Sequence, residues 1–257
     1  SGSAVTLKAG WDGTAGYGGA PSDLGGNLLT SGSVNIQTDD SGSILVEAYE
    51  SDAPSTLGDI ILGAGTMVSG GNVTVAAKGH NTIGGMLEAA VNMGLSAGRL
   101  GYLAASSNRG GNLVLTGTSN LQAGYLSLEA FAGALTPYGG GNITQAGSLV
   151  STGSRIEFFS DRNLTINGSV TSADAIYADI GNNVTNAFGG NLNFGAGSMV
   201  SASDYIEMAT YAGANAPGTI TQAAGSSIAS TGSYIGLYAD GTLTLRGVMK
   251  PVNLPFS

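Results

Sequence analysis

The chain has 257 residues, of which 44 are glycine, while 42% are hydrophobic and only 10% are charged. This balance argues against intrinsic disorder, and the absence of a Gly-X-Y period argues against collagen. A net charge of −9 argues against a nucleic-acid interface and against binding to an anionic membrane surface. No apolar run approaches 18 residues, so we expect no insertion into a membrane as a helix. Cysteine is absent and His80 is the only histidine, so we expect no disulfide, no metal site and no cofactor.

A glycine-rich repeat runs along the chain in about nine copies, best seen in GGNLNFGAGSMVSASDYIEMATYAG from Gly189 to Gly213. The third position of each copy sets the phase of the repeat. In chain order these positions are Asn27, Asp59, Met86, Asn112, Asn142, Asn163, Asn191, Thr219 and Thr242. The gaps range from 21 residues (Asn142 to Asn163) to 32 residues (Asn27 to Asp59), which is typical of a solenoid with variable loops.

Each copy contains three short apolar segments, and the third alternates cleanly between apolar and polar positions, as in Ile206, Met208 and Thr210. Alternation with period two predicts a half-buried strand. The equivalent positions are Val5/Leu7/Ala9, Ile44/Val46/Ala48, Val73/Val75/Ala77, Leu100/Tyr102/Ala104, Leu126/Leu128/Ala130, Ile156/Phe158/Ser160 and Ile235/Leu237/Ala239.

Three strands per repeat, joined by glycine-rich corners, predict an all-β fold, a right-handed parallel β-helix with three strands per coil and about nine coils. We expect one β-helix domain over residues 1–257, open at both ends. The recurrent asparagine that opens the first strand predicts a ladder of stacked amides. Its expected members are Asn27, Asn112, Asn142, Asn163 and Asn191.

The repeated pattern G-N-[ILV]-x-[ILV], followed by A-G-S-x-[VI]-x-S, resembles the repeats of filamentous haemagglutinin-like exoproteins. These are bacterial surface adhesins exported by two-partner secretion. The resemblance covers roughly Gly25 to Lys250, and the N-P-N-G type motif of the family's secretion domain does not occur. It implies a secreted or cell-surface rod that serves as an adhesin shaft or as a matrix fibre.

Aromatic residues recur at one outward position of the third strand, namely Tyr125, Tyr205 and Tyr234, with Arg155 in the same column. Sugars stack on such rings, so the column is a candidate contact for a host or matrix glycan. Cross-strand packing between neighbouring rings is the alternative explanation.

A carbohydrate-active β-helix enzyme, either a polysaccharide lyase or a hydrolase, is the alternative function. Such enzymes need clustered carboxylates, and Glu157 and Glu207 share an outward position two coils apart, with Tyr177 between them. We expect these carboxylates to be exposed, solubilising charges. No acidic residue lies within seven positions of His80, which we expect to be a solvated loop residue.

The two ends of the repeat array are complementary in phase. Residues Val5, Leu7 and Ala9 supply a third strand, whereas Leu243–Leu245 and Val248–Met249 supply a first and a second strand. We therefore expect head-to-tail self-association into a filament, or a place within a longer shaft. Taken together, the sequence favours a non-enzymatic structural or adhesive protein.

Overall fold

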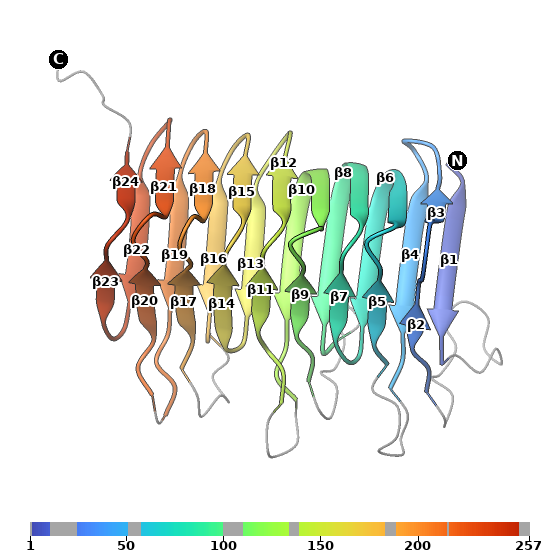
Figure 1. Cartoon of the computed structure of the whole chain (residues 1–257), viewed down its shortest axis with the longest axis horizontal. Coiled ribbons are helices and arrows are strands. Elements are labelled where there is room, and N and C mark those ends of the chain that lie inside the picture. Colours follow the sequence, from blue (N-terminus) through green and yellow to red (C-terminus); the bar gives the residue numbers. More distant parts are fainter. Residues whose placement is uncertain are drawn as a thin grey trace.

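The computed structural model describes residues 2–10, 25–50, 58–99, 110–133, 139–182, 189–214 and 216–251. These residues form β-strands and their connections, without a helix. All pairings between the named strands are parallel, within one sheet of nine strands and one of fifteen. Figure 1 shows the strands following one another along the long axis in the order of the chain. The prediction of an all-β, parallel, solenoid-like fold is confirmed at this level.

The nine-stranded sheet takes one short strand from each repeat. Its strands are β2 (Leu28–Leu29), β5 (Ile60–Leu62), β7 (Asn81–Ile83), β9 (Leu113–Leu115), β11 (Ile143–Gln145), β14 (Asn163–Ile166), β17 (Asn191–Phe194), β20 (Thr219–Gln222) and β23 (Leu243–Leu245). Successive strands pair without a shift along this sheet, so equivalent residues of neighbouring repeats lie side by side.

The fifteen-stranded sheet carries the remaining strands of the repeats. They are β1 (Ala4–Ala9), β3 (Val34–Gln37), β4 (Ser43–Ala48), β6 (Thr66–Ala77), β8 (Met86–Ala97), β10 (Asn120–Ala130), β12 (Ser148–Ser151), β13 (Ile156–Ser160), β15 (Ser169–Ser172), β16 (Ile176–Ile180), β18 (Met199–Ala202), β19 (Ile206–Thr210), β21 (Ser227–Ser230), β22 (Ile235–Ala239) and β24 (Val248–Lys250). Strand β10 pairs with β12 through its first half and with β13 through its second half.

The core lies between the strands, and it is filled by the alternating apolar positions that the sequence pattern predicted. Ile206 and Met208 are fully buried, and they pair in register with Ile176 and Ala178 of the preceding repeat. Ile176 and Ile206 stack as identical side chains, while the small Ala178 leaves room for the longer side chain of Met208. Val5, Leu7 and Ala9 of β1 likewise pair with Ile44, Val46 and Ala48 of β4, as expected.

Two assignments in the third repeat are corrected by the strand register. Met86 opens β8 and pairs with Met67 and Asn120, so it does not begin the first strand of a repeat. That strand is β7, and the residue level with Asp59 and Asn112 is His80.

The strand predicted over Leu100, Tyr102 and Ala104 lies outside the described residues. The corresponding register is taken instead by Met93, Leu95 and Ala97 of β8, which pair with Leu126, Leu128 and Ala130. The alternation therefore occurs seven residues earlier than predicted in this repeat.

Glycines at the corners allow neighbouring repeats to approach each other closely. A Cβ atom at Gly168 would lie 2.1 Å from the carbonyl oxygen of Gly147, its counterpart in the preceding repeat. Gly181, which ends one repeat, has a φ of 80°, a backbone conformation that residues with a Cβ atom rarely adopt. The high glycine content therefore reflects stacking of backbone on backbone at the corners.

Candidate functional site

The predicted aromatic column lies on the outer side of strands β10, β13, β16, β19 and β22. Register places Tyr125, Arg155, Ala175, Tyr205 and Tyr234 at the same level. Each directly precedes an inward-facing Leu or Ile, which is buried except for the partly buried Ile235. The next outward column contains Glu157, Tyr177 and Glu207. We call these two columns, from Tyr125 to Tyr234, the tyrosine face.

A compact polar cluster forms where Tyr125 meets the following repeat. The Tyr125 hydroxyl donates a hydrogen bond to Glu157 Oε2, and Arg155 Nε lies 2.6 Å from Glu157 Oε1. The carboxylate of Glu157 is therefore held from both sides, and the residue is buried. The expectation of an exposed, solubilising carboxylate at Glu157 is wrong, because the side chains of Tyr125 and Arg155 cover it.

A second cluster brings Tyr205 and Tyr234 together one repeat apart. Their rings stack with centroids 5.4 Å apart and an interplanar angle of 6°. The Tyr234 hydroxyl donates to Glu207 Oε2, and its side chain remains 41% exposed. The rings thus pack against each other, as the cross-strand alternative predicted, while the outer part of Tyr234 stays accessible to a ligand.

The hydroxyls of Tyr125 and Tyr234 are weaker acids than an ordinary tyrosine. Burial, together with the hydrogen bond to Glu157, raises the pKa of Tyr125 from 10.0 to about 12. The hydrogen bond to Glu207 raises the pKa of Tyr234 to about 12 as well. A phenolate at either position would face a carboxylate, so the neutral hydroxyl is favoured in the folded chain.

Alkaline titration should reveal the Tyr125 cluster. Because its pKa is raised on folding, Tyr125 contributes stability below pH 10, and this contribution is lost as pH rises from about 10 to about 12. We expect Tyr125→Phe to flatten the fall of unfolding free energy over this pH range. Urea denaturation at a series of pH values measures it.

The control is Thr171→Ala on the same sheet, because Thr171 is exposed on the outer side of β15 and has no titratable group. Its alkaline profile should follow that of the unmodified chain. An unchanged profile in Tyr125→Phe would contradict the role of the Tyr125–Glu157 hydrogen bond.

The carboxylates proposed for catalysis are not brought together. Glu157 and Glu207 both pair in register with Tyr177, so two strand spacings of about 4.8 Å separate them. The resulting distance of about 10 Å exceeds the separation of about 5–5.5 Å in retaining glycosidases and lies at the limit for inverting ones. Each carboxylate also accepts a hydrogen bond from a tyrosine.

A column of polar side chains begins the strands of the nine-stranded sheet. Asn142 Nδ2 donates to Asn112 Oδ1 at 2.9 Å, Asn163 Nδ2 to Asn142 Oδ1 at 2.8 Å, and Asn191 Nδ2 to Asn163 Oδ1 at 2.9 Å. Thr219 continues the column through its hydroxyl, which donates to Asn191 Oδ1. At the other end of the column, Asn27 Oδ1 accepts the backbone N–H of Asp59.

His80 belongs to this column, which the sequence analysis missed. The backbone N–H of His80 donates to Asp59 Oδ1, and His80 Nδ1 accepts the backbone N–H of Asn112 at 3.0 Å. His80 does lie in a connection and is half-exposed, as expected, but its imidazole is not free, since Nδ1 accepts the backbone N–H of the following repeat. A polar residue precedes the first strand of most repeats. If Asn81 is taken as the start of that strand in the third repeat, His80 occupies this polar position.

No group of three or more His, Asp or Glu that could hold a metal ion occurs in the part of the chain that the structure describes. No helix long and apolar enough to cross a membrane is found there either. A comparison with known protein families, curated proteins and solved structures finds no match to the chain.

Proposed function

We propose that the chain forms a right-handed parallel β-helix with three strands per coil. Each repeat before the last supplies one strand to the nine-stranded sheet and two strand segments to the fifteen-stranded sheet, which supports a coil of three. Crossovers between parallel strands of one sheet are right-handed in about 98% of cases. Nine coils at about 4.8 Å each make a rod about 40 Å long.

The rod is proposed to act as a non-enzymatic extracellular structural element, either the shaft of an adhesin or a subunit of a matrix fibre. The observation that carries this proposal is one uninterrupted core, which runs from Ile36 to Ile228 through successive repeats. Such stacking builds length and stiffness. The acidic, cysteine-free composition and the resemblance to filamentous haemagglutinin-like exoproteins support a secreted or bacterial cell-surface location.

The tyrosine face is the proposed contact with a glycan on a host or matrix surface. The exposed part of Tyr234 offers an apolar ring to the C–H faces of sugars, while Arg155, 48% exposed, offers donors to their hydroxyls. A single contact of this kind is weak. Many rods displayed together would raise the overall affinity through multivalency.

A second copy of the chain is the other proposed partner, at the end formed by β23 and β24. Leu243 and Leu245 lie in register with the buried Ile220 and Gln222, yet they are 45% and 43% exposed. The edges of β23 and β24 also carry backbone groups that a further parallel strand would satisfy. A head-to-tail contact would cover the two exposed leucine side chains and pair these backbone groups.

The glycan contact is tested with immobilised glycan arrays and the double variant Tyr205→Ala/Tyr234→Ala. We expect at least about a tenfold loss of binding, because the variant removes the stacked ring pair. The control is Thr171→Ala, on the outer side of β15, which should bind like the unmodified chain. Equal binding by both variants would contradict a role of the tyrosine face.

The alternative function, a polysaccharide lyase or hydrolase, draws on the Arg155–Glu157–Tyr125 cluster, which joins a carboxylate, a cation and a phenol. Incubation with acidic and neutral polysaccharides discriminates the two functions. The structural function predicts unchanged polymer length. Shortening of the polymer that disappears in Glu157→Gln would instead establish the enzyme.

A further inference from the structure

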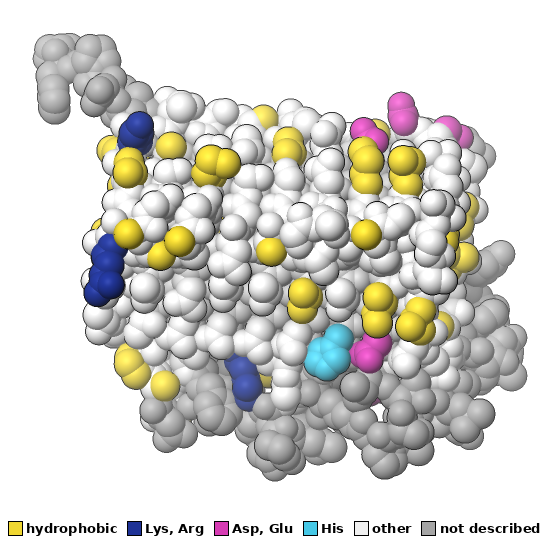
Figure 2. Space-filling view, viewed as in Figure 1, with side chains coloured by type: hydrophobic (Ala, Val, Ile, Leu, Met, Phe, Trp, Pro, Cys, Tyr) yellow, Lys and Arg dark blue, Asp and Glu magenta, His cyan; other side chains and the backbone are white. Residues whose placement is uncertain are grey.

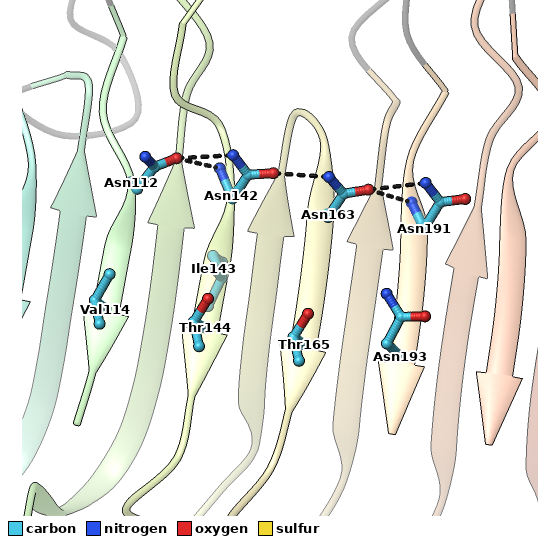
Figure 3. A pocket seen from close by; sticks show the side chains of 9 residues that line it. All are labelled: Asn112, Val114, Asn142, Ile143, Thr144, Asn163, Thr165, Asn191 and Asn193. Atoms are coloured by element: carbon cyan, nitrogen blue, oxygen red, sulfur yellow. Dashed lines mark hydrogen bonds between the residues drawn. The ribbon is translucent and has the colours of Figure 1, made fainter. Parts of the chain in front are cut away.

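A shallow groove of about 530 Å³ lies on the outer side of the nine-stranded sheet, away from the tyrosine face. It crosses strands β9, β11, β14 and β17, as Figure 3 shows. One side is the asparagine column, and the other is the outward column two residues further along each strand. The lining residues are Asn112, Val114, Asn142, Ile143, Thr144, Asn163, Thr165, Asn191 and Asn193.

The second column has polar groups that the protein itself does not use. The side chains of Thr144, Thr165 and Asn193 form no hydrogen bond within the described part of the chain, and all three are half-buried. Asn163 and Asn191 each donate one amide hydrogen to the side-chain oxygen of the asparagine in the preceding repeat. The second amide hydrogen of each is free to bind a ligand. Donors and acceptors therefore line both sides of the groove.

None of the lining residues carries a charge, although the chain as a whole has a net charge of −9. Figure 2 shows that the lack of charge extends beyond the groove. The middle of this face is mostly uncharged, and charged side chains lie toward its ends and lower edge. The apolar contribution comes from Val114 and from the threonine methyl groups. Amides, hydroxyls and methyl groups together suit a neutral molecule rich in hydroxyl groups.

The groove is also periodic, since each strand brings the same pair of positions at intervals of about 4.8 Å. An extended chain of hexopyranoses linked through equatorial bonds advances by a similar distance per sugar. Successive sugars would therefore meet equivalent amide and hydroxyl groups. We propose that this groove binds a linear, uncharged polysaccharide that lies along the rod axis, across strands β9 to β17.

The test is affinity electrophoresis of the whole chain in native gels that contain hydroxyethyl cellulose, galactomannan or dextran, with alginate as an acidic comparison. We expect hydroxyethyl cellulose or galactomannan, whose backbones have equatorial linkages, to retard the chain more than dextran, whose linkages are axial at the anomeric carbon. Thr165→Arg, which places a long cation in the middle of the groove, should weaken this interaction at least about tenfold. Thr144→Arg, one strand away in the same column, should have the same effect.

Thr221→Arg is the matched control, because Thr221 occupies the same outward column next to Asn193 but lies outside the groove. It should migrate like the unmodified chain on each neutral polymer, and the unfolding midpoints of all variants verify folding. Retardation by no neutral polymer, stronger retardation by alginate, or equal effects of Thr165→Arg and Thr221→Arg would overturn the proposal.

This proposal does not depend on the tyrosine face. The Tyr205→Ala/Tyr234→Ala variant should keep its retardation on the neutral polymer, because both residues lie on the fifteen-stranded sheet. Loss of retardation in the tyrosine variant but not in Thr165→Arg would assign polysaccharide binding to the tyrosine face alone and overturn a site in the groove.

Discussion

Replacing Phe158 by alanine is expected to lower the free energy of unfolding by about 3–5 kcal/mol. Phe158 is fully buried in β13, where it pairs in register with Leu128 on one side and Ala178 on the other. Ala178 is too small to fill the cavity that the substitution leaves, and Leu128 is held in its own core position, so the cavity remains. Urea denaturation followed by circular dichroism measures the loss.

Phe159 provides the matched control, because it is the same residue type at the next position of the same strand. Its side chain points to the outer side, where its ring contacts Tyr177 with centroids 6.1 Å apart. Phe159→Ala should therefore cost clearly less than Phe158→Ala. Equal losses in the two variants would contradict the burial pattern of β13 and with it the shared core.

Replacing Asn163 by alanine is expected to cost about 1–3 kcal/mol. Asn163 donates to Asn142 Oδ1, and its own Oδ1 accepts both the backbone N–H and the side-chain amide of Asn191. The substitution thus removes three hydrogen bonds at once and leaves half-buried polar groups of two neighbouring repeats without partners. The same urea denaturation reports the change.

The comparison for this variant is Asn193→Ala, one repeat away and two positions further along its strand. The Asn193 side chain has no hydrogen bond within the described residues, so its loss should change stability by no more than about 0.5 kcal/mol. A loss for Asn163→Ala of only a few tenths of a kcal/mol would show that the amide column contributes little to stability.

Much of the fold could be predicted because the core positions repeat with a period of two. In the strand that contains Ile206, Met208 and Thr210, for example, the alternating pattern identified the buried side chains directly. The third repeat resisted prediction for a physical reason. Its first strand places the polar Asn81 in the core, where the amide donates to the carbonyl oxygens of Val75 and Ser96, so the apolar signal is missing.

Gly84 and Gly85 resemble the glycine pair with which most repeats begin, and this likeness led to the wrong prediction. The pair lies instead in the corner between β7 and β8. Membership of the polar column requires only an acceptor at the correct level. Asp59 Oδ1 and His80 Nδ1 meet this requirement as well as an asparagine does. A search for asparagine alone could not find them.

The position of the tyrosine column could also be predicted, because constant spacing from the alternating core residues fixes the outward positions. The surroundings of its carboxylates could not. Glu157 is covered by Tyr125, 32 positions earlier in the chain, and by Arg155, two positions earlier on its own outer face. Whether a ring covers a carboxylate depends on side-chain geometry between neighbouring repeats, which a single strand pattern does not contain.

The hydrogen bonds of the polar column all run in one direction. From Asn27 to Thr219, the donor always belongs to the later repeat and the acceptor to the earlier one. Their dipoles therefore add along the axis and polarise one another, as in a hydrogen-bonded chain. The polar column thus has a donor-presenting end and an acceptor-presenting end, so the proposed head-to-tail contact would require molecules that point the same way.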